Sequence, residues 1–290
     1  MARINSVFWR RKVSSGFELM SLSQLRHKVL DHSLAEPQRL DFHLILLFES
    51  GNGSHMVDFK MHGCEPGTLI HVSPNQVHAF GKNADNEASL LIFRPEFLPT
   101  DFYGPESKIN PPPEYVWPPA TRLNESSMKF ATAAIDFLKN QQTSQGVWAE
   151  PEAARHIAIG LASFAFRTAA ASDPVYRQPQ PLFYAFVTEL ENSFQTRRDA
   201  KWYAGQLDCS YRSLCRVCKA VTGETPKTMI DRRVATEARR LLAFTAISVS
   251  KIGAQLGFTE PTNFVKFFQR VVGETPDSFR RDWQNQSEIN

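Results

Sequence analysis

Apolar side chains recur at helical spacing twice in the last third of the chain. One stripe ends before Gly223 and the other ends before Gly273. Their members are spaced as on one face of a helix. They are Leu214, Val217, Cys218 and Val221 in the first stripe, and Phe264, Phe267, Phe268 and Val271 in the second. The pattern predicts two amphipathic helices at equivalent places in two related segments.

The same tetrapeptide, Gly-Glu-Thr-Pro, follows both stripes, at 223–226 and at 273–276. Glycine supplies the left-handed conformation that ends one helix, threonine caps the next, and proline in the first turn loses no hydrogen bond. Each copy therefore predicts a helix, a sharp stop and a new helix. Because the residues before the tetrapeptide also agree in type, we interpret this region as a duplication.

A short helix is predicted before each stripe. The first covers about 200–207 behind a cap at Asp199, and the second covers 249–256, capped by Ser248 and closed by Gly257. Each copy is then a short helix, a turn of three or four residues and a longer helix. This is the helix-turn-helix arrangement, whose second helix enters the major groove of DNA.

The two predicted helix-turn-helix units occupy about 200–222, with Ser210 capping the longer helix, and about 249–272. A linking helix from Pro226 to Leu242 joins them. The face opposite each apolar stripe is polar and basic. Its members are Arg212, Ser213, Arg216 and Lys219 in the first unit, and Thr262, Asn263, Lys266, Gln269 and Arg270 in the second.

The pattern changes to short strands and turns over residues 41–98. Strands are predicted at 42–48, 55–61, 68–72 and 90–93, with a hairpin signal at 50–53 and a turn at 63–67. Several short strands separated by turns favour a sandwich or a barrel.

Prolines between Pro99 and Pro119 allow no regular element there. Two helical patterns follow, at about 124–141 and 148–168, and residues 172–181 read as an extended linker. The predicted organisation is a multi-domain α+β chain. It has a β-rich domain with a helical connector at 1–171 and an all-α domain at 182–290.

Charge and composition sharpen this division. The net charge is +3, but residues 182–290 alone carry +4, and all eight histidines lie before residue 157. A basic segment with side chains on one helix face is typical of proteins that bind polyanions. The sequence predicts no membrane span and no secretory signal, and four cysteines fit a reducing cytoplasm.

The spacing Cys215-x-x-Cys218, with Cys209 nearby, raises the question of zinc or a redox pair. The second copy has Val265 and Phe268 at the equivalent positions, and no histidine follows His156 to complete a metal site. We therefore interpret these cysteines as structural and predict no metal and no cofactor.

Two helix-turn-helix units on one linking helix resemble the AraC/XylS family of bacterial transcription regulators over residues 183–283. Ile252 through Arg280 is the most specific stretch, with Gly257-Phe258, Asn263-Phe264 and the second Gly-Glu-Thr-Pro. Gly253 departs from the family, which usually has alanine at the helix crossing, and this change is expected to loosen the second unit slightly.

The resemblance implies distinct roles for the polar residues. Base reading falls to Arg212, Ser213 and Arg216 in the first unit and to Thr262, Asn263 and Lys266 in the second. Arginine can bind guanine through two hydrogen bonds, and asparagine suits adenine. Lys219, Gln269 and Arg270 would hold phosphates. The two units would read adjacent major-groove segments, about 34 Å apart.

The first domain resembles the cupin-like jelly roll of AraC-type effector-binding domains. The resemblance rests on His43, Gly51-Asn52-Gly53, Pro66-Gly67-Thr68-Leu69 and Pro74 to His78. A ligand pocket without metal is expected, in which His43, His78 and Arg94 could orient a small molecule. These three could equally be ordinary rim or surface residues. The two helices of the connector either form a dimer interface, as in the family, or pack on their own barrel.

Together these features predict a cytoplasmic, DNA-binding transcription activator that is not an enzyme. It would bind double-stranded DNA, a small-molecule effector, a second copy of itself and RNA polymerase. Two alternatives remain at this point. One is a metal-dependent cupin enzyme fused to a DNA-binding module, and the other is a regulator controlled by a partner protein.

Overall fold

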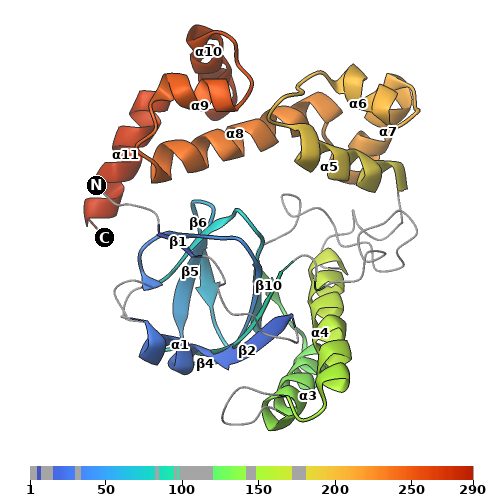
Figure 1. Ribbon diagram of the computed structural model, residues 1–290, viewed down its shortest axis with the longest axis vertical. Coiled ribbons are helices and arrows are strands. Elements are labelled where there is room, and N and C mark those ends of the chain that lie inside the picture. The colour runs from blue at the N-terminus through green and yellow to red at the C-terminus, as the bar shows by residue number, and fades with distance from the viewer. Residues whose placement is uncertain are drawn as a thin grey trace. The chain divides into compact units, whose positions relative to one another are not determined.

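A computed structural model of the chain describes residues 5–7, 16–29, 34–81, 85–94, 97, 120–141, 148–171 and 181–289 (Figure 1). Among these residues the chain divides into two compact units, one N-terminal to residue 175 and one C-terminal to it. The predicted proline-rich segment and nearly all of the predicted linker lie outside the described residues.

Within the described residues, the N-terminal unit contains two five-stranded sheets, ordered β1-β3-β8-β5-β6 and β10-β7-β4-β9-β2. Only the β1–β3 pair is parallel among the pairs described. The strands are β1 (Asn5–Val7), β2 (Phe17–Ser21), β3 (Gln38–Leu40), β4 (His43–Ser50), β5 (Gly53–Val57), β6 (Lys60–Cys64), β7 (Thr68–Val72), β8 (Val77–Phe80), β9 (Glu87–Phe93) and β10 (Ala120–Arg122). Helix α1 (Leu22–Lys28) follows β2 behind a capping box at Ser21.

Alternate residues of β4 serve two separate cores, because successive side chains of a strand point to opposite faces. Leu44, Leu46 and Phe48 join residues of both sheets in the interior between them. Ile45 and Leu47 point the other way, toward two long helices that cover the outer face of their sheet. The domain therefore has an inner layer between the sheets and an outer layer beneath the helices.

The covering helices are α3 (Glu125–Gln141) and α4 (Pro151–Ala171), which lie side by side in Figure 1. The Asn124 side chain accepts a hydrogen bond from the Ser127 backbone N–H and so caps α3. The buried face of α3 places Ala131, Ile135 and Leu138 in the outer core. Both helices pack on the sheet of their own chain, which was one of the two expectations.

One predicted strand is in fact two. Residues 55–61 belong to β5 and β6, which pair as an antiparallel hairpin through Asp58 and Phe59. Both turn residues have positive φ, 43° and 72°. An aspartate followed by glycine usually signals such a turn. Here Phe59 stands in the place of the glycine, and the signal is incomplete.

The C-terminal unit is entirely helical within the described residues. Its helices are α5 (Pro181–Ser193), α6 (Ala200–Gln206), α7 (Tyr211–Thr222), α8 (Pro226–Phe244), α9 (Val249–Gln255), α10 (Pro261–Val272) and α11 (Pro276–Ile289). The predicted caps are present at Asp199, Ser210, Thr225 and Ser248, each accepting a backbone hydrogen bond. The multi-domain α+β fold predicted from the sequence is confirmed.

The linking helix α8 buries charged side chains as well as apolar ones. Asp231, Arg233, Glu237 and Arg240 are each less than 8% exposed. Arg233 donates to Glu191 on α5 and, together with Arg240, to Glu237 on its own helix. A buried charge is tolerated only when it is paired in this way. The network therefore fastens α5 to the linking helix.

No helix in the described parts of the chain is long and apolar enough to cross a membrane.

Candidate functional site

The two longer helices of the helix-turn-helix units, α7 and α10, are matched in length and in how they end. Each spans twelve residues and stops at a glycine in the left-handed conformation, Gly223 at φ 72° and Gly273 at φ 97°. The turns before them differ. Residues 207–210 separate α6 from α7, but 256–260 separate α9 from α10. The second turn is thus one residue longer than the sequence predicts.

On α7 the predicted polar face is exposed, with one exception. Arg212, Arg216 and Lys219 extend into solvent, and no ion pair of these three is described. Ser213 is half-buried, its backbone N–H donates to Ser210 Oγ, and the two hydroxyl oxygens lie 2.9 Å apart. Ser213 is therefore part of the helix cap as well as a predicted base contact.

On α10 the predicted residues Thr262, Asn263, Lys266 and Gln269 are exposed. Arg270 is also exposed, but its guanidinium lies 3.1 Å from the carboxylate of Asp231 on α8. A side chain held in this pair has a structural contact besides the phosphate contact expected of it.

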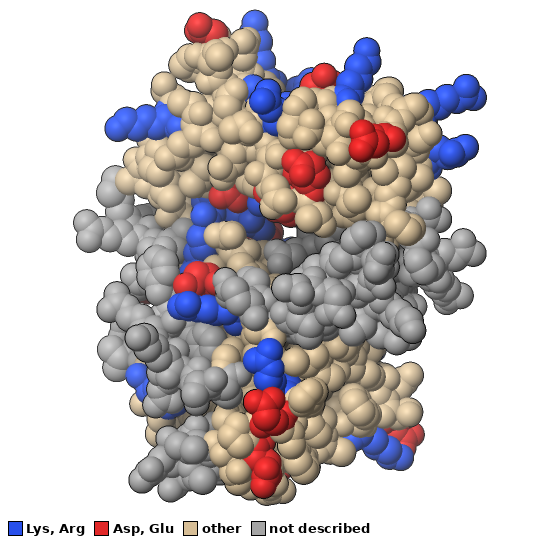
Figure 2. Space-filling view, turned by 45° about the vertical axis from the view of Figure 1, so that its right-hand side comes forward, with Lys and Arg blue, Asp and Glu red and all other residues tan. Residues whose placement is uncertain are grey.

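The apolar faces hold these helices in place. Leu214, Cys218, Phe264 and Phe268 are fully buried. Each exposed residue of α7 and α10 therefore has a fixed direction, because the opposite face of its helix is anchored in the core. Figure 2 shows Lys and Arg side chains standing out from the margin of this unit. Side chains that project from the surface can reach DNA without unfolding anything.

The cysteines of α7, Cys215 and Cys218, pack against the core side of their helix. All four cysteines of the chain are free, and the described residues contain no group of three or more His, Cys, Asp and Glu side chains placed to hold a metal ion. Burial raises the pKa of Cys218 to about 12. A buried thiol of this kind packs as an apolar side chain.

In the N-terminal unit, the structure does not bring His43, His78 and Arg94 together. His43 lies in the outer layer, where its ring stacks on Phe93. His78 lies on β8 in the other sheet, on the same face as Phe80 of the inner core. Arg94 is exposed and pairs with Asp41 at 4.0 Å.

Each of the two buried histidines has a histidine partner that was not predicted from the sequence. His43 Nδ1 lies 3.1 Å from His71 Nε2, and His78 Nδ1 lies 3.1 Å from His55 Nε2. In each pair the two histidines lie diagonally on neighbouring strands. His71 on β7 stands opposite Ile45, two residues along β4 from His43. His55 on β5 stands opposite Phe80, two residues along β8 from His78. Even spacing within strands could have indicated His55 and His71, but not which residues they meet.

His62 on β6 stands directly opposite His55 in the sheet. Together with His78 these residues form a set we term the inner histidines, His55, His62 and His78. Each has one buried ring nitrogen without a hydrogen-bond partner, namely His55 Nδ1, His62 Nε2 and His78 Nε2. A buried polar atom without a partner is unusual, since it loses its bond to water and gains nothing.

Burial favours the neutral form of the two histidine pairs, His43 with His71 and His55 with His78. It lowers the pKa of His43 to about 3 and that of His78 to about 4. The pKa of His55 and of His71 is also well below the usual value, first because of burial and then because of the neighbouring histidine. Neutral imidazoles can both donate and accept hydrogen bonds.

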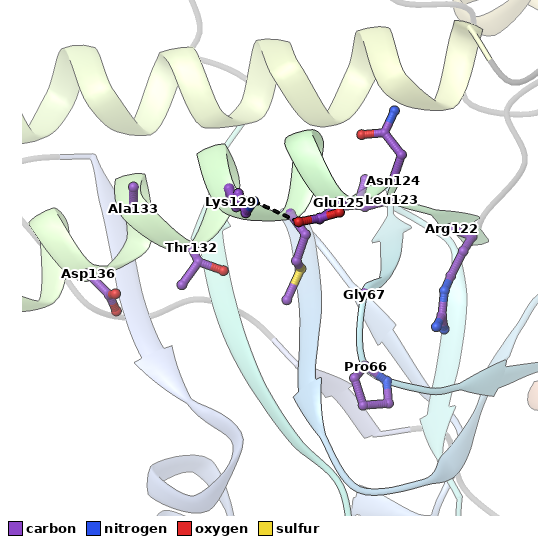
Figure 3. A pocket seen from close by; sticks show the side chains of 11 residues that line it. Pro66, Gly67, Arg122, Leu123, Asn124, Glu125, Lys129, Thr132, Ala133 and Asp136 are labelled. Atoms are coloured by element: carbon purple, nitrogen blue, oxygen red, sulfur yellow. Dashed lines mark hydrogen bonds and ion pairs between the residues drawn. The ribbon is translucent and has the colours of Figure 1, made fainter.

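A surface cleft of about 550 Å³ lies beside α3. Figure 3 shows Arg122 and Asp136 toward its opposite ends and the ion pair between Lys129 and Glu125 along its wall. Arg122 also pairs with Glu65. Since most of these charges already have partners, the cleft presents little unmet charge to a ligand.

Comparisons with known proteins agree with the two-unit architecture. The family model of a helix-turn-helix domain matches residues 203–282, and the model of an AraC-like ligand binding domain matches residues 27–145. The chain is 23% identical over 248 residues to the HTH-type transcriptional activator RhaR of Salmonella dublin, covering 86% of this chain and 87% of the relative. RhaR of Salmonella heidelberg (strain SL476) is 24% identical with the same coverage.

Two solved structures stand among those to which the chain is similar. The DNA-binding domain of AdpA in complex with a target DNA covers 38% of this chain and 99% of its own, at 23% identity and a TM-score of 0.35. ToxT from Vibrio cholerae covers 91% of this chain and 97% of its own, at 10% identity and a TM-score of 0.43.

The two matched domain models account for both compact units in the order that the sequence predicts. They describe regulators rather than enzymes, so the alternative of a metal-dependent cupin enzyme fused to a DNA-binding module finds no support in them. The chain belongs to the AraC family of transcriptional regulators, with an N-terminal ligand-binding domain and a C-terminal helix-turn-helix DNA-binding domain.

Proposed function

We propose that this regulator activates transcription by binding two adjacent major-groove segments of double-stranded DNA with α7 and α10. The observation that carries the proposal is the matched exposure of the polar faces. Arg212 and Arg216 on α7 correspond to Thr262 and Lys266 on α10, and all four are exposed above a buried apolar face. Activation is favoured by the names of the RhaR relatives, which are transcriptional activators.

The roles of the polar residues follow from their places. Arg212, Arg216, Thr262, Asn263 and Lys266 lie in the first half of their helices, which meets base edges in this arrangement. Ser213 would read a base only at the expense of its bond to Ser210. Lys219 and Gln269, nearer the helix ends, are proposed phosphate contacts. Arg270 is proposed as a third phosphate contact, which it can make if its ion pair with Asp231 opens or if its guanidinium binds both groups at once.

The test is selection of bound sequences from random duplex DNA by the full-length protein. Each bound chain is expected to select two conserved segments about one helical turn apart, so a bound dimer would select two such pairs. A single conserved segment would contradict the proposal that both units read bases. Binding should weaken steeply as salt increases, because phosphate neutralisation releases counterions.

The proposed effector site is the interior of the N-terminal unit beside the inner histidines. Three buried ring nitrogens without partners can be satisfied by a ligand that carries hydroxyl, amide or carboxyl groups. His78 of the predicted trio belongs to this set. His43 and Arg94 stay predictions, and their places in the outer layer and on the surface leave them outside it.

The effector would act by binding one arrangement of the regulator more tightly and raising its population. A thermal-shift screen of small polar metabolites tests this, with His78→Gln as the variant and His27→Gln, an exposed histidine, as the control. A compound that stabilises the wild type and the control but not the variant is expected. Purified protein that responds to no small molecule, but is retained by a partner protein, would favour control by that partner.

A homodimer is proposed through the outer face of α3. Phe130 is 50% exposed and Phe137 is 38% exposed, although the opposite face of the same helix is buried in the outer core. The Phe130 ring also contacts Phe164 of α4 at 4.8 Å between centroids. Large exposed aromatic side chains on one helix face commonly mark a protein interface.

Sedimentation analysis distinguishes the outcomes for this dimer. Phe137→Glu should shift the full-length protein from dimer to monomer, whereas Lys129→Glu on the cleft side of α3 should not. RNA polymerase remains a proposed partner, as expected of an activator. The proposed compartment is the cytoplasm, where free cysteines stay reduced.

A further inference from the structure

The loop between α5 and α6 reaches from the first helix-turn-helix unit to the turn of the second. Its residue Arg198 donates a hydrogen bond from Nη2 to the backbone carbonyl of Gly257, at 2.5 Å. The same guanidinium lies over the ring of Phe258, 3.6 Å from the ring centroid. One side chain thus contacts two successive residues of the turn between α9 and α10, by a hydrogen bond and by a cation–π contact.

Gly257 is suited to this contact in two ways. Its φ of 75° is one that residues with a side chain rarely adopt. A Cβ at this position would also lie 2.4 Å from the backbone oxygen of Gln195, which belongs to the same α5–α6 loop as Arg198. The equivalent residue of the first turn, Asp208, also has positive φ but carries a side chain. The glycine therefore serves the close approach of the two units as well as the turn.

Asp231 supplies a second connection. Its side chain is 8% exposed and projects from α8, where it accepts from Lys227 one turn away and from Arg270 on α10. Its charge also favours the protonated form of Arg198, against the lowering of the Arg198 pKa by burial. The carboxylate thus holds α10 against the linking helix, close enough to Arg198 for the two charges to interact.

We propose that Arg198 and Asp231 form a latch that fixes the second helix-turn-helix unit on the first and so sets the spacing of DNA segments that the regulator accepts. Arg198 is in this view a positioning residue and not a base-reading residue. The proposal rests on the proposed function in one respect, which is that α7 and α10 bind the same DNA together.

The physical reason is preorganisation. Without the latch, α9 and α10 would be held to the first unit by the packing of α8 and by the approach of Gly257 to Gln195. Small rotations would then change the separation of the two recognition helices. A rigid pair binds a site of matching spacing without an ordering cost, and it rejects other spacings. A looser pair loses affinity for the matching site but accepts mismatched spacings more readily.

The test compares DNA sites that differ only in spacing. From the site selected by the wild type, duplexes with one or two base pairs inserted or deleted between the two segments are made. Fluorescence anisotropy then gives the affinity of full-length wild type, Arg198→Ala, Arg198→Lys and Arg197→Ala. Arg197 is the matched control, because its guanidinium lies over Trp202 within the first unit.

The wild type should lose about tenfold or more in affinity when the spacing changes, comparable with a mismatched base pair. Arg198→Ala should bind the original site several-fold more weakly and lose clearly less on respacing. Arg198→Lys should lie between, since lysine can donate to the carbonyl but has no flat guanidinium. Arg197→Ala should behave as the wild type.

Two results would overturn the latch. One is a spacing penalty in Arg198→Ala equal to that of the wild type. The other is an equal loss on specific and random DNA with a shallower salt dependence, which would make Arg198 a phosphate contact. If the wild type itself tolerates every spacing, the proposed reading by two units has failed instead.

Amide hydrogen exchange of the free protein tests the latch without DNA. The latch predicts faster exchange in α9 and α10 of Arg198→Ala than in the control, with α6 and α7 unchanged, and equal exchange in both variants would reject it. Should Arg198→Ala fail to fold, Phe258→Leu removes the ring but keeps an apolar side chain. It should relax the spacing penalty in the same direction.

Discussion

The two helix-turn-helix units have the same skeleton but build their cores from different side chains. At the crossing of the short and long helices, the first unit has Ala204 and Leu214, and the second has Gly253 and Phe264. All four residues are buried. A smaller residue on one helix accompanies a larger one on the other, so the duplicated units keep a similar filled volume by different means.

Gly253 does not leave a gap at the crossing of the second unit. Because glycine has no side chain, the sequence predicts a loosened crossing of α9 and α10 at this position. In the structure, a Cβ at Gly253 would lie 3.0 Å from Cβ and 3.1 Å from Cγ of Phe264. The space that alanine would occupy is already taken by the phenylalanine, so the crossing is filled.

The largest expected effect comes from emptying each core. Phe264→Ala should lower the free energy of unfolding by about 3–5 kcal/mol, and Leu214→Ala by about 2–5 kcal/mol. Phe264 should be the costlier loss, because its ring also contacts those of Phe258 and Phe268. Urea unfolding followed by circular dichroism measures both. An equal or greater loss for Leu214→Ala would show that the second unit does not depend on its aromatic core.

The next effect concerns the exposed faces. Arg216→Ala and Lys266→Ala should each reduce discrimination between the selected site and one altered in the contacted base by about 1–3 kcal/mol. Lys219→Ala is the matched control and should weaken binding evenly across sequences, as a phosphate contact does. Competition binding with altered duplexes gives these values. Even losses for Arg216→Ala or Lys266→Ala would assign that residue to phosphates.

A smaller difference in stability is expected from the residues that begin α7 and α10. Ser210 caps α7 through its side chain, whereas Glu260 at the start of α10 makes no such hydrogen bond. Ser210→Ala should therefore cost about 1 kcal/mol of stability, and Glu260→Ala should cost almost nothing. Thermal unfolding of both variants tests the difference. Similar losses would mean that the second helix has a cap of its own.

The smallest effect should come from the crossing itself. Gly253→Ala gains helix propensity of up to about 1 kcal/mol, but the new methyl group meets Phe264. In the wild-type background the gain should vanish, and in a Phe264→Leu background, which recreates the first unit, it should return. The same unfolding measurement on the four variants completes a double-mutant cycle. Additive changes would contradict the packing argument.

The helical unit could be predicted closely from the sequence because its signals are local. Glycine, threonine and proline mark helix ends within a few residues of one another, and the duplication checks each reading against a second copy. The extra residue in the second turn escaped prediction, since Thr259 and Glu260 carry no strong turn signal. The pair between Arg270 and Asp231 also escaped, because it joins residues far apart in the sequence.

The β-rich unit could be predicted only in outline. Strands β1, β2, β3, β8 and β10 went unpredicted, and the turn at Asp58 and Phe59 lies within what the pattern predicts as one strand. The candidate histidines depend on which face of which strand they occupy. A shift of one residue reverses the face, so the sequence alone could not show that His43 and His78 belong to different layers or that each meets another histidine.

The paired histidines also couple the folding of the N-terminal unit to pH, because they must lose their protons to be buried. In the unfolded chain an imidazole has its usual pKa of about 6.5, whereas in the fold those of His43 and His78 are about 3 and about 4. Below pH 6.5 the unfolded chain therefore binds more protons than the folded one. Stability must be lost progressively as the pH falls from there toward 4.

The C-terminal unit contains no histidine and lacks this proton uptake. As the pH falls from 7 to 5, the buried histidines should therefore cost the ligand-binding domain stability that the DNA-binding domain does not lose in this way. Hydrogen exchange at both pH values, corrected for the pH dependence of the intrinsic exchange rate, measures this difference. Mild acid would then weaken the two domains of one chain unequally, because only the ligand-binding domain takes up protons on its histidines when it unfolds.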